Sequence, residues 1–191
     1  METKNIMIVG VGGQGTLLAS KLLGYVLVNE GYDVKVSEVH GMSQRGGSVV
    51  TYVRFGDKVY SPIIDKGEAD IILSFELLEA ARWLEYLKPD GQVIVNTQKT
   101  EPMPVITGAA EYPEDLVKKI CDKGVSVDAK DFLAVAENVG SSKAVNIALM
   151  GRLSKYFPEI SKEAWIKGIE ANVPAKFLEL NKKAFELGLE V

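Results

Sequence analysis

Short runs of apolar residues alternate with longer amphipathic segments along most of the chain. Five of these runs predict strands, at residues 5–10, 33–39, 69–75, 92–96 and 125–129. Helical spacing predicts helices between them, at residues 14–31, 76–87 and 112–124. Buried strands that alternate with helices are typical of a mostly parallel sheet covered on both faces. The pattern therefore predicts an α/β fold in three layers.

Two regions depart from this alternation. Residues 48–55 alternate strictly between apolar and other side chains, and the turn at Gly56 and Asp57 leads into residues 58–62. This pattern predicts an inserted β-hairpin formed by these two segments. Residues 97–110 contain prolines and glycine and predict a loop, whereas residues 129–190 predict a helical C-terminal region.

Composition limits the classes of protein that fit. The 191 residues are 47% hydrophobic, which favours a single domain over residues 1–191. The net charge of −4 gives no support for nucleic-acid binding. No apolar run approaches the roughly eighteen residues of a membrane span, and the N-terminus leads directly into a strand pattern rather than a signal peptide. We therefore expect a protein without nucleic-acid or membrane partners.

The chain has one cysteine, Cys121, and one histidine, His40. A single cysteine cannot form an internal disulfide, which fits the reducing cytoplasm. An iron–sulfur cluster of the 4Fe–4S type takes four thiolates, so this chain cannot hold one alone, and a closed zinc site is excluded on the same ground. We expect Cys121 to be a thiol of the hydrophobic core at the end of a helix, and we expect no metal on the chain.

A glycine-rich turn joins the first strand to the first helix. Its glycines are Gly10, Gly12, Gly13 and Gly15, and the order G-x-G-x-x-G between a strand and a helix is typical of a Rossmann-like dinucleotide site. It is not a P-loop, because Thr16 stands where that motif needs lysine.

Three interpretations of this turn stay open. It permits close packing of helix on strand, or it contacts a partner, or it contacts an anion or cofactor at the helix N-terminus. In the last two cases Gln14 belongs to the contact surface with the glycines. Glu38, at the end of the second strand, lies roughly where an acid would bind a ribose.

Several long stretches together resemble a known family. They are "GVGGQGTLLASKLLG", "EVHGMSQRGGSVVTYVRFG", "VYSPII", "GEADIILSFELLEAARWLEYLKPDGQVIVN" and the terminal "NKKAFELG". The chain closely resembles the beta subunits of indolepyruvate:ferredoxin oxidoreductases, which belong to the gamma-type subunits and domains of 2-oxoacid:ferredoxin oxidoreductases. The resemblance covers nearly the whole chain, and its most specific part is the Met-Ser-Gln-Arg-Gly-Gly stretch.

The resemblance implies a subunit of an enzyme complex that oxidatively decarboxylates an arylpyruvate to an acyl-CoA. In this family a larger alpha subunit carries thiamine diphosphate and the iron–sulfur clusters, and ferredoxin accepts the electrons. The small subunit carries no cofactor, is inactive alone, and helps to enclose the active site near CoA. The chain also lacks the Gly-Asp-Gly motif of thiamine diphosphate sites, since Pro89 precedes Asp90 and Gly91.

The resemblance also gives a meaning to the polar loop after the second strand. His40, Ser43, Gln44 and Arg45 would lie at the carboxyl edge of the sheet, on one rim with the glycine turn and with Asn96, which ends a later strand. Arg45 would pair there with a substrate carboxylate, a CoA phosphate or a partner acid, or would instead brace the loops of its own chain. We expect this rim to form an interface or the border of an active site, and we expect no catalytic residue on this chain.

Alternatives from other classes remain at this stage. The chain could be the gamma subunit of a pyruvate, 2-oxoisovalerate or 2-oxoglutarate:ferredoxin oxidoreductase. It could also be a stand-alone NAD(P)-dependent oxidoreductase that uses Gly10, Gly12 and Gly15, or a module that binds a nucleotide or CoA.

Glu76 and Glu79 open a helix after a strand, where acids favour the positive end of the helix dipole.

Overall fold

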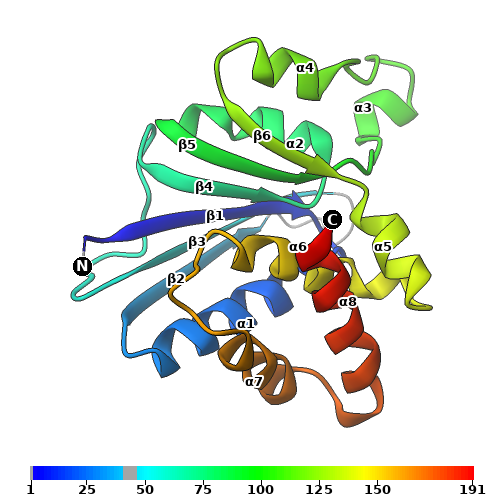
Figure 1. The fold of residues 1–191 in the computed structure, drawn as a ribbon. Coiled ribbons are helices and arrows are strands. Elements are labelled where there is room, and N and C mark those ends of the chain that lie inside the picture. Colours follow the sequence, from blue (N-terminus) through cyan, green and yellow to red (C-terminus); the bar gives the residue numbers. More distant parts are fainter. Residues whose placement is uncertain (1, 41–46) are drawn as a thin grey trace.

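The computed structural model describes residues 2–40 and 47–191, and it places a six-stranded sheet between two layers of helices (Figure 1). The strand order is β2-β3-β1-β4-β5-β6. The strands are β1 (Lys4–Val11), β2 (Asp33–His40), β3 (Ser48–Gly56), β4 (Ala69–Ser74), β5 (Leu87–Asn96) and β6 (Ser126–Lys130). The helices are α1 (Thr16–Asn29), α2 (Leu77–Arg82), α3 (Met103–Ile106), α4 (Leu116–Cys121), α5 (Phe132–Asn138), α6 (Val145–Ser154), α7 (Lys162–Asn172) and α8 (Leu178–Glu190). Short 3₁₀ helices lie between some of these elements, at η1 (Leu84–Tyr86), η2 (Ser142–Ala144) and η3 (Ala175–Phe177).

The sheet is mostly parallel, as the sequence predicts. β1, β4, β5 and β6 pair in parallel, whereas β3 is antiparallel to both of its neighbours, β1 and β2. Because β2 is antiparallel to β3 and β3 is antiparallel to β1, β2 runs in the same direction as β1. Five strands therefore end at one edge of the sheet, and only β3 begins there.

The predicted hairpin partner of β3 is wrong. Residues 58–62 form no strand, and β3 instead pairs with β2 over its whole length, from Asp33 opposite Gly56 to His40 opposite Val49. Period-two alternation shows that a strand has two different faces, but it does not show which strand lies beside it. The structure therefore does contain an antiparallel pair of strands, but β3 forms it with β2 and not with residues 58–62.

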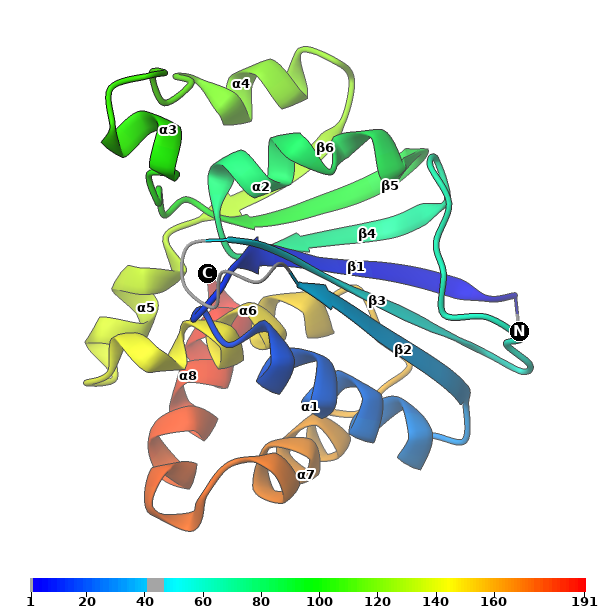
Figure 2. The same cartoon turned by 180° about the vertical axis from the view of Figure 1, so that it is seen from behind.

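Two hydrophobic clusters lie on opposite faces of the sheet. On one face Ile8, Val53 and Leu73 pack with α1 and with the C-terminal helices α5 to α8. On the other face Val9, Tyr52 and Val95 pack with α2 and α4. Figures 1 and 2 show the same division, with α2, α3 and α4 above the strands and the remaining helices below. Alternate residues of each strand thus supply both cores, which explains the continuous apolar runs in the sequence.

Several predicted element ends differ from the structure. The predicted helix at 76–87 is shorter, since α2 ends at Arg82 and β5 already begins at Leu87.

Cys121 is exposed, so its assignment to the core is wrong. The buried residues of α4 are Leu116 and Ile120, which are four residues apart and share one face of the helix. Cys121 follows Ile120 and therefore lies on a different side of the helix. Within the described residues, no helix is long and apolar enough to cross a membrane.

Candidate functional site

The glycine turn follows β1 at the edge where the parallel strands end, and the Gln14 side chain fills its inner side. The Gln14 Oε1 atom accepts a hydrogen bond from the Val11 N–H at 2.9 Å, and Nε2 donates to the Phe75 carbonyl at 3.3 Å. A Cβ on Gly10 would lie 2.7 Å from that Oε1 atom and 3.0 Å from the Phe75 Cβ. A side chain at Gly10 would therefore crowd Gln14 and Phe75, the residue that follows β4.

The last glycine of the turn brings together two helices that are distant in sequence. Gly15 has φ +88°, and a Cβ there would lie 2.7 Å from the Asn146 Nδ2 atom. The Asn146 side chain is 4% exposed and its Nδ2 atom donates to the Gly15 carbonyl at 3.5 Å. The start of α1 thus rests directly on the first turn of α6.

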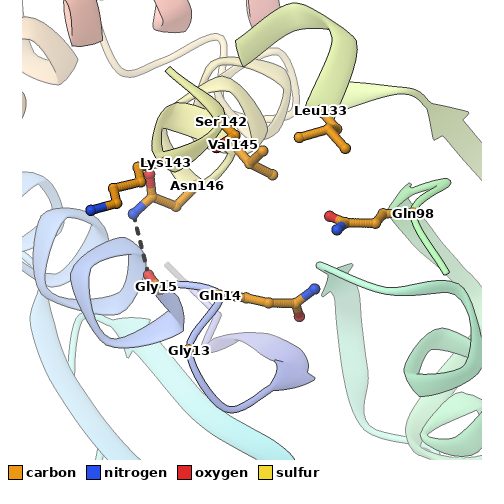
Figure 3. A pocket seen from close by; sticks show the side chains of 9 residues that line it. All are labelled: Gly13, Gln14, Gly15, Gln98, Leu133, Ser142, Lys143, Val145 and Asn146. Atoms are coloured by element: carbon orange, nitrogen blue, oxygen red, sulfur yellow. Dashed lines mark hydrogen bonds between the residues drawn. The ribbon is translucent and has the colours of Figure 1, made fainter. Parts of the chain in front are cut away.

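A cavity of about 450 Å³ opens beside this contact. Its volume lies within the roughly 300–1,000 Å³ that is usual for small-molecule sites. In Figure 3 the Gln98 amide points into the space between Gln14 and Leu133, and the Asn146 side chain reaches Gly15. The lining residues are Gly13, Gln14, Gly15, Gln98, Leu133, Ser142, Lys143, Val145 and Asn146.

The lining favours a negatively charged ligand. Among the residues that the structure describes, the lining contains Lys143 and no acidic side chain. α1 starts at the cavity without a side-chain cap. The segment that leads into α6 starts at η2, where the Ser141 hydroxyl accepts from the Lys143 N–H at 3.3 Å, and the Ile147 N–H of α6 donates to the Asn146 Oδ1 atom at 2.8 Å. The first backbone N–H groups of a helix have no acceptor inside the helix and carry partial positive charge. The start of α1 therefore presents hydrogen-bond donors at the cavity and Lys143 lies on its border, which suits phosphate or carboxylate.

Asn96 is a buried brace for the loops of this edge. The side chain is 0% exposed and lies at the end of β5. Its Nδ2 atom donates at 3.3 Å to the Phe75 carbonyl and to the Gln98 Oε1 atom, while Oδ1 accepts from the Phe132 N–H at 3.0 Å. Asn96 thus joins the exits of β4 and β5 to the start of α5, and it fixes the Gln98 amide at the cavity. Because Asn96 lies beneath the rim, a ligand would meet Gln98 instead.

Glu76 and Glu79 are buried parts of the same edge and do more than favour a helix dipole. Glu76 is 1% exposed and caps α2 by accepting from the Glu79 N–H at 2.9 Å. Its other oxygen accepts from the Thr100 N–H at 3.0 Å and from the Tyr112 hydroxyl. Burial and then this bond to Glu76 raise the pKa of Tyr112, so the phenol stays protonated and donates.

Glu79 anchors the first residue of β3. Its carboxylate accepts from the Ser48 hydroxyl and, at 3.3 Å, from the Trp83 indole N–H. The Gly12 N–H donates to the Gly47 carbonyl at 2.9 Å. Two hydrogen bonds therefore attach residues 47 and 48 to the glycine turn and to α2. Residue 47, at which the described chain resumes, therefore lies beside the glycine turn.

The structure places some of the predicted rim residues and leaves others outside the described chain. Gly13, Gln14 and Gly15 line the cavity, whereas Gly10 and Gly12 lie in the turn behind it. His40 ends β2 at the same edge, opposite Val49. Ser43, Gln44 and Arg45 lie outside the described residues, as does the side chain of His40, and the roles proposed for them stay predictions.

The strand order argues against a dinucleotide site. In a dinucleotide-binding fold the acid that holds the ribose ends the strand beside β1. Here β3 separates β1 from β2, so Glu38 lies two strand spacings away, about 10 Å across the sheet. The Glu38 carboxylate accepts instead from the Thr51 hydroxyl at 3.3 Å. The inserted strand removes the feature on which a nicotinamide-binding interpretation depends.

The residues of this chain do not fit an iron–sulfur cluster. Such a cluster is bound through several thiolates, and the sequence supplies only Cys121, which is exposed on α4. Among the described residues, no three histidine, cysteine or acidic side chains are grouped as metal ligands.

The amino-acid sequence is similar to known proteins over nearly its whole length. The family model of pyruvate ferredoxin/flavodoxin oxidoreductase matches residues 5–191. The chain belongs to this family. It is 45% identical to the indolepyruvate oxidoreductase subunit IorB of Thermococcus kodakarensis, over 100% of this chain and 96% of that protein. It is 26% identical to the common gamma subunit of pyruvate/ketoisovalerate oxidoreductases of the same organism, over 93% of this chain and 90% of that one.

A solved structure shows the same fold in this family. The gamma subunit of a keto/oxoacid ferredoxin oxidoreductase from Geobacter sulfurreducens superposes with a TM-score of 0.72 and 25% identity, covering 98% of this chain and 96% of that one. The predictions of an α/β fold, of an oxidoreductase subunit and of this family are therefore confirmed. As a member of the pyruvate ferredoxin/flavodoxin oxidoreductase family, the chain is one subunit of an enzyme complex.

Sequence reasoning missed part of the cavity. Gln98 lies two residues after a predicted strand, so the rule that ligands gather at carboxyl edges could have indicated it. Lys143 and Asn146 come from the helical C-terminal region, and Asn146 lies 131 residues from its partner Gly15. The Gly-Ser-Ser sequence at 140–142 indicates the start of a helix there, but no signal in the sequence places that start against the glycine turn.

Proposed function

We propose that this chain is the small subunit of a thiamine diphosphate-dependent 2-oxoacid:ferredoxin oxidoreductase of the indolepyruvate type. The observation that carries the proposal is the contrast between two relatives from one organism. Identity is 45% to the indolepyruvate subunit and 26% to the pyruvate/ketoisovalerate gamma subunit, each over more than nine-tenths of the chain. The complex oxidatively decarboxylates an arylpyruvate, transfers the acyl group to CoA, and passes the electrons to ferredoxin.

In this proposal the larger alpha subunit holds thiamine diphosphate and the iron–sulfur clusters. The cofactors supply the carbanion and electron-transfer chemistry, and the small chain supplies shape and charge around them. The lack of cluster ligands on this chain supports such a division of labour. The complex acts in the cytoplasm, and the isolated chain has no activity of its own.

The cavity beside Gly13 and Gly15 contributes to CoA binding. CoA carries a diphosphate and a 3′-phosphate. The donors at this cavity suit these phosphate groups better than they suit an arylpyruvate, which has a large apolar ring. Lys143, the Gln98 amide and the start of α1 hold a phosphate group at the rim. His40, Ser43, Gln44 and Arg45 belong to the same rim and contact CoA, the substrate or the alpha subunit.

The test is to express the chain with the alpha subunit under anaerobic conditions and to assay ferredoxin reduction with CoA. The proposal expects indolepyruvate or another arylpyruvate to be used with a higher kcat/KM than pyruvate, 2-oxoisovalerate or 2-oxoglutarate. Preference for one of these aliphatic acids would move the chain to the pyruvate-type or 2-oxoglutarate-type enzymes. Activity of the chain alone with NAD(P) would overturn the subunit proposal.

The role of the cavity needs a variant and a control. Lys143→Gln removes the cation at the cavity and should raise KM for CoA about tenfold, with KM for the 2-oxoacid unchanged. Lys167→Gln changes an exposed lysine on α7 that does not line the cavity and should leave both constants unchanged. An equal KM for CoA in the Lys143 variant and the parent enzyme would show that CoA does not bind at this cavity.

A further inference from the structure

An exposed apolar surface lies on the loop that leaves the cavity. We define the α3 loop as residues 98–115, with α3 at its outer end (Figures 1 and 2). Met103 is 66% exposed and Ile106 is 61% exposed, and among the large apolar residues that the structure describes only Tyr60 is more exposed. The two are three residues apart on α3, so they share one side of the helix. The exposed residues Pro104, Ala109 and Ala110 extend the apolar surface.

The α3 loop is held at both ends by one buried carboxylate. Glu76 accepts from the Thr100 N–H near the beginning of the loop and from the Tyr112 hydroxyl near its end. The Tyr112 oxygen also accepts from the Leu78 N–H at 3.1 Å, and the Leu77 N–H donates to the Gln98 carbonyl at 3.2 Å. These bonds fix the loop on the first turn of α2. The apolar side of α3 is thus presented in a set position, which reduces the entropy lost when a partner covers it.

The charges of the loop indicate what kind of surface covers it. Four exposed acids flank α3, namely Glu101, Glu111, Glu114 and Asp115, and none forms an ion pair within residues 2–40 and 47–191. The only basic residue of the loop, Lys99, lies 5.5 Å above the Tyr112 ring. Asp115 also has φ +55°, the only positive value of a non-glycine residue in the described chain. An apolar patch with an acidic border fits an apolar hollow bordered by lysine and arginine.

We propose that the α3 loop docks the chain onto the alpha subunit of its complex, with Met103 and Ile106 in an apolar hollow that has a basic border. This inference rests on the proposed function for the existence of that subunit. The loop begins at Gln98, which lines the cavity assigned to CoA, so a subunit that completes the active site over the cavity reaches α3 as well. A second copy of this chain would bring two acidic borders together, which disfavours self-association through this surface.

The experiment measures the binding of the purified chain to the purified alpha subunit under anaerobic conditions. The double variant Met103→Ser/Ile106→Ser should raise the Kd about tenfold or more, as expected for the loss of two anchors at an interface. Its melting temperature alone should equal that of the parent chain, because both side chains are exposed. Tyr60→Ser is the matched control: Tyr60 is 89% exposed but lies between β3 and β4, at the opposite edge of the sheet, and its loss should not change the Kd.

A second variant tests the charges. Glu101→Lys/Glu111→Lys should weaken binding most at low salt, since the added cations would face a basic border. Parent affinity in the Met103/Ile106 variant, or equal weakening by Tyr60→Ser, would overturn the docking site. Self-association of the chain that Met103→Ser/Ile106→Ser abolishes would also overturn it, in favour of a second copy. Failure of the parent chain to bind the alpha subunit would instead overturn the proposed function.

Discussion

The glycine turn and the crossing of α6 with α8 both depend on glycine, but for different reasons. At the crossing, a Cβ on Gly188 would lie 2.0 Å from the Ala148 carbonyl oxygen, and one on Gly151 would lie 2.1 Å from the Phe185 carbonyl oxygen. These helices are in backbone contact, so any side chain at either glycine forces them apart. In the turn, Gly13 has φ +97° and no atom of residues 2–40 or 47–191 within 4 Å of its would-be Cβ. Glycine allows close packing at the α6–α8 crossing, whereas at Gly13 it allows a left-handed backbone at the border of the cavity.

The α6–α8 crossing should give the largest effect on stability. Gly188→Ala must separate two backbones inside the larger hydrophobic cluster, and overpacking of this kind costs about 3 kcal/mol. For a chain of this size that loss corresponds to a melting temperature roughly 6–12 °C lower. Thermal unfolding followed by circular dichroism measures it.

Gly24→Ala is the matched control for that change. Gly24 is also inside a helix, but the nearest atom to its would-be Cβ, the Val36 Cγ2 atom, is 3.8 Å away. Alanine there should stabilise the helix by about 0.5–1 kcal/mol. Similar stability of the Gly188 and Gly24 variants would show that the two helices can move apart without cost.

Gly15 combines both roles and should give the second-largest effect. Gly15→Ala places a side chain at φ +88° and 2.7 Å from the Asn146 Nδ2 atom, which together should cost about 2 kcal/mol. In an Asn146→Ala background the contact is absent and only the left-handed strain of about 1 kcal/mol should remain. Urea unfolding of the four proteins gives this difference. An equal cost in both backgrounds would mean that the Asn146 side chain moves aside freely.

Gly13→Ala should cost less stability than Gly188→Ala or Gly15→Ala and should give the clearest effect on function. Gly13→Ala and Gly31→Ala introduce the same strain of about 1 kcal/mol, because both glycines have positive φ and open surroundings. Only Gly13 lines the cavity, so only Gly13→Ala should raise KM for CoA in the assembled complex. Steady-state kinetics with varied CoA measures this difference. A matching rise for Gly31→Ala would attribute the effect to strain.

Much of the fold follows from local patterns. Apolar runs predict five of the strands, and helical spacing predicts α1 together with Gly31, which has φ +91° after the helix end. Parallel pairing was predicted because the strands need cover on both faces. Of the residues predicted for the rim, Gly13, Gln14 and Gly15 line the cavity and Asn96 lies buried beneath it, while their roles stay predictions. The errors concern choices that a local pattern does not contain: the partner of β3, the position of Cys121 and the residues that complete the cavity.

The sequence by itself determined the order of the elements, the mostly parallel sheet, the glycine turn between a strand and a helix, and the family. Each of these depends on residues close together in the chain or on the similarity of whole stretches. Only the tertiary structure decided that β3 lies between β1 and β2, which moves Glu38 away from the turn, and that Asn146 packs on Gly15. The physical reason is that strand order and helix packing depend on burial of surfaces from distant segments, and neither leaves a periodic signal in the segment itself.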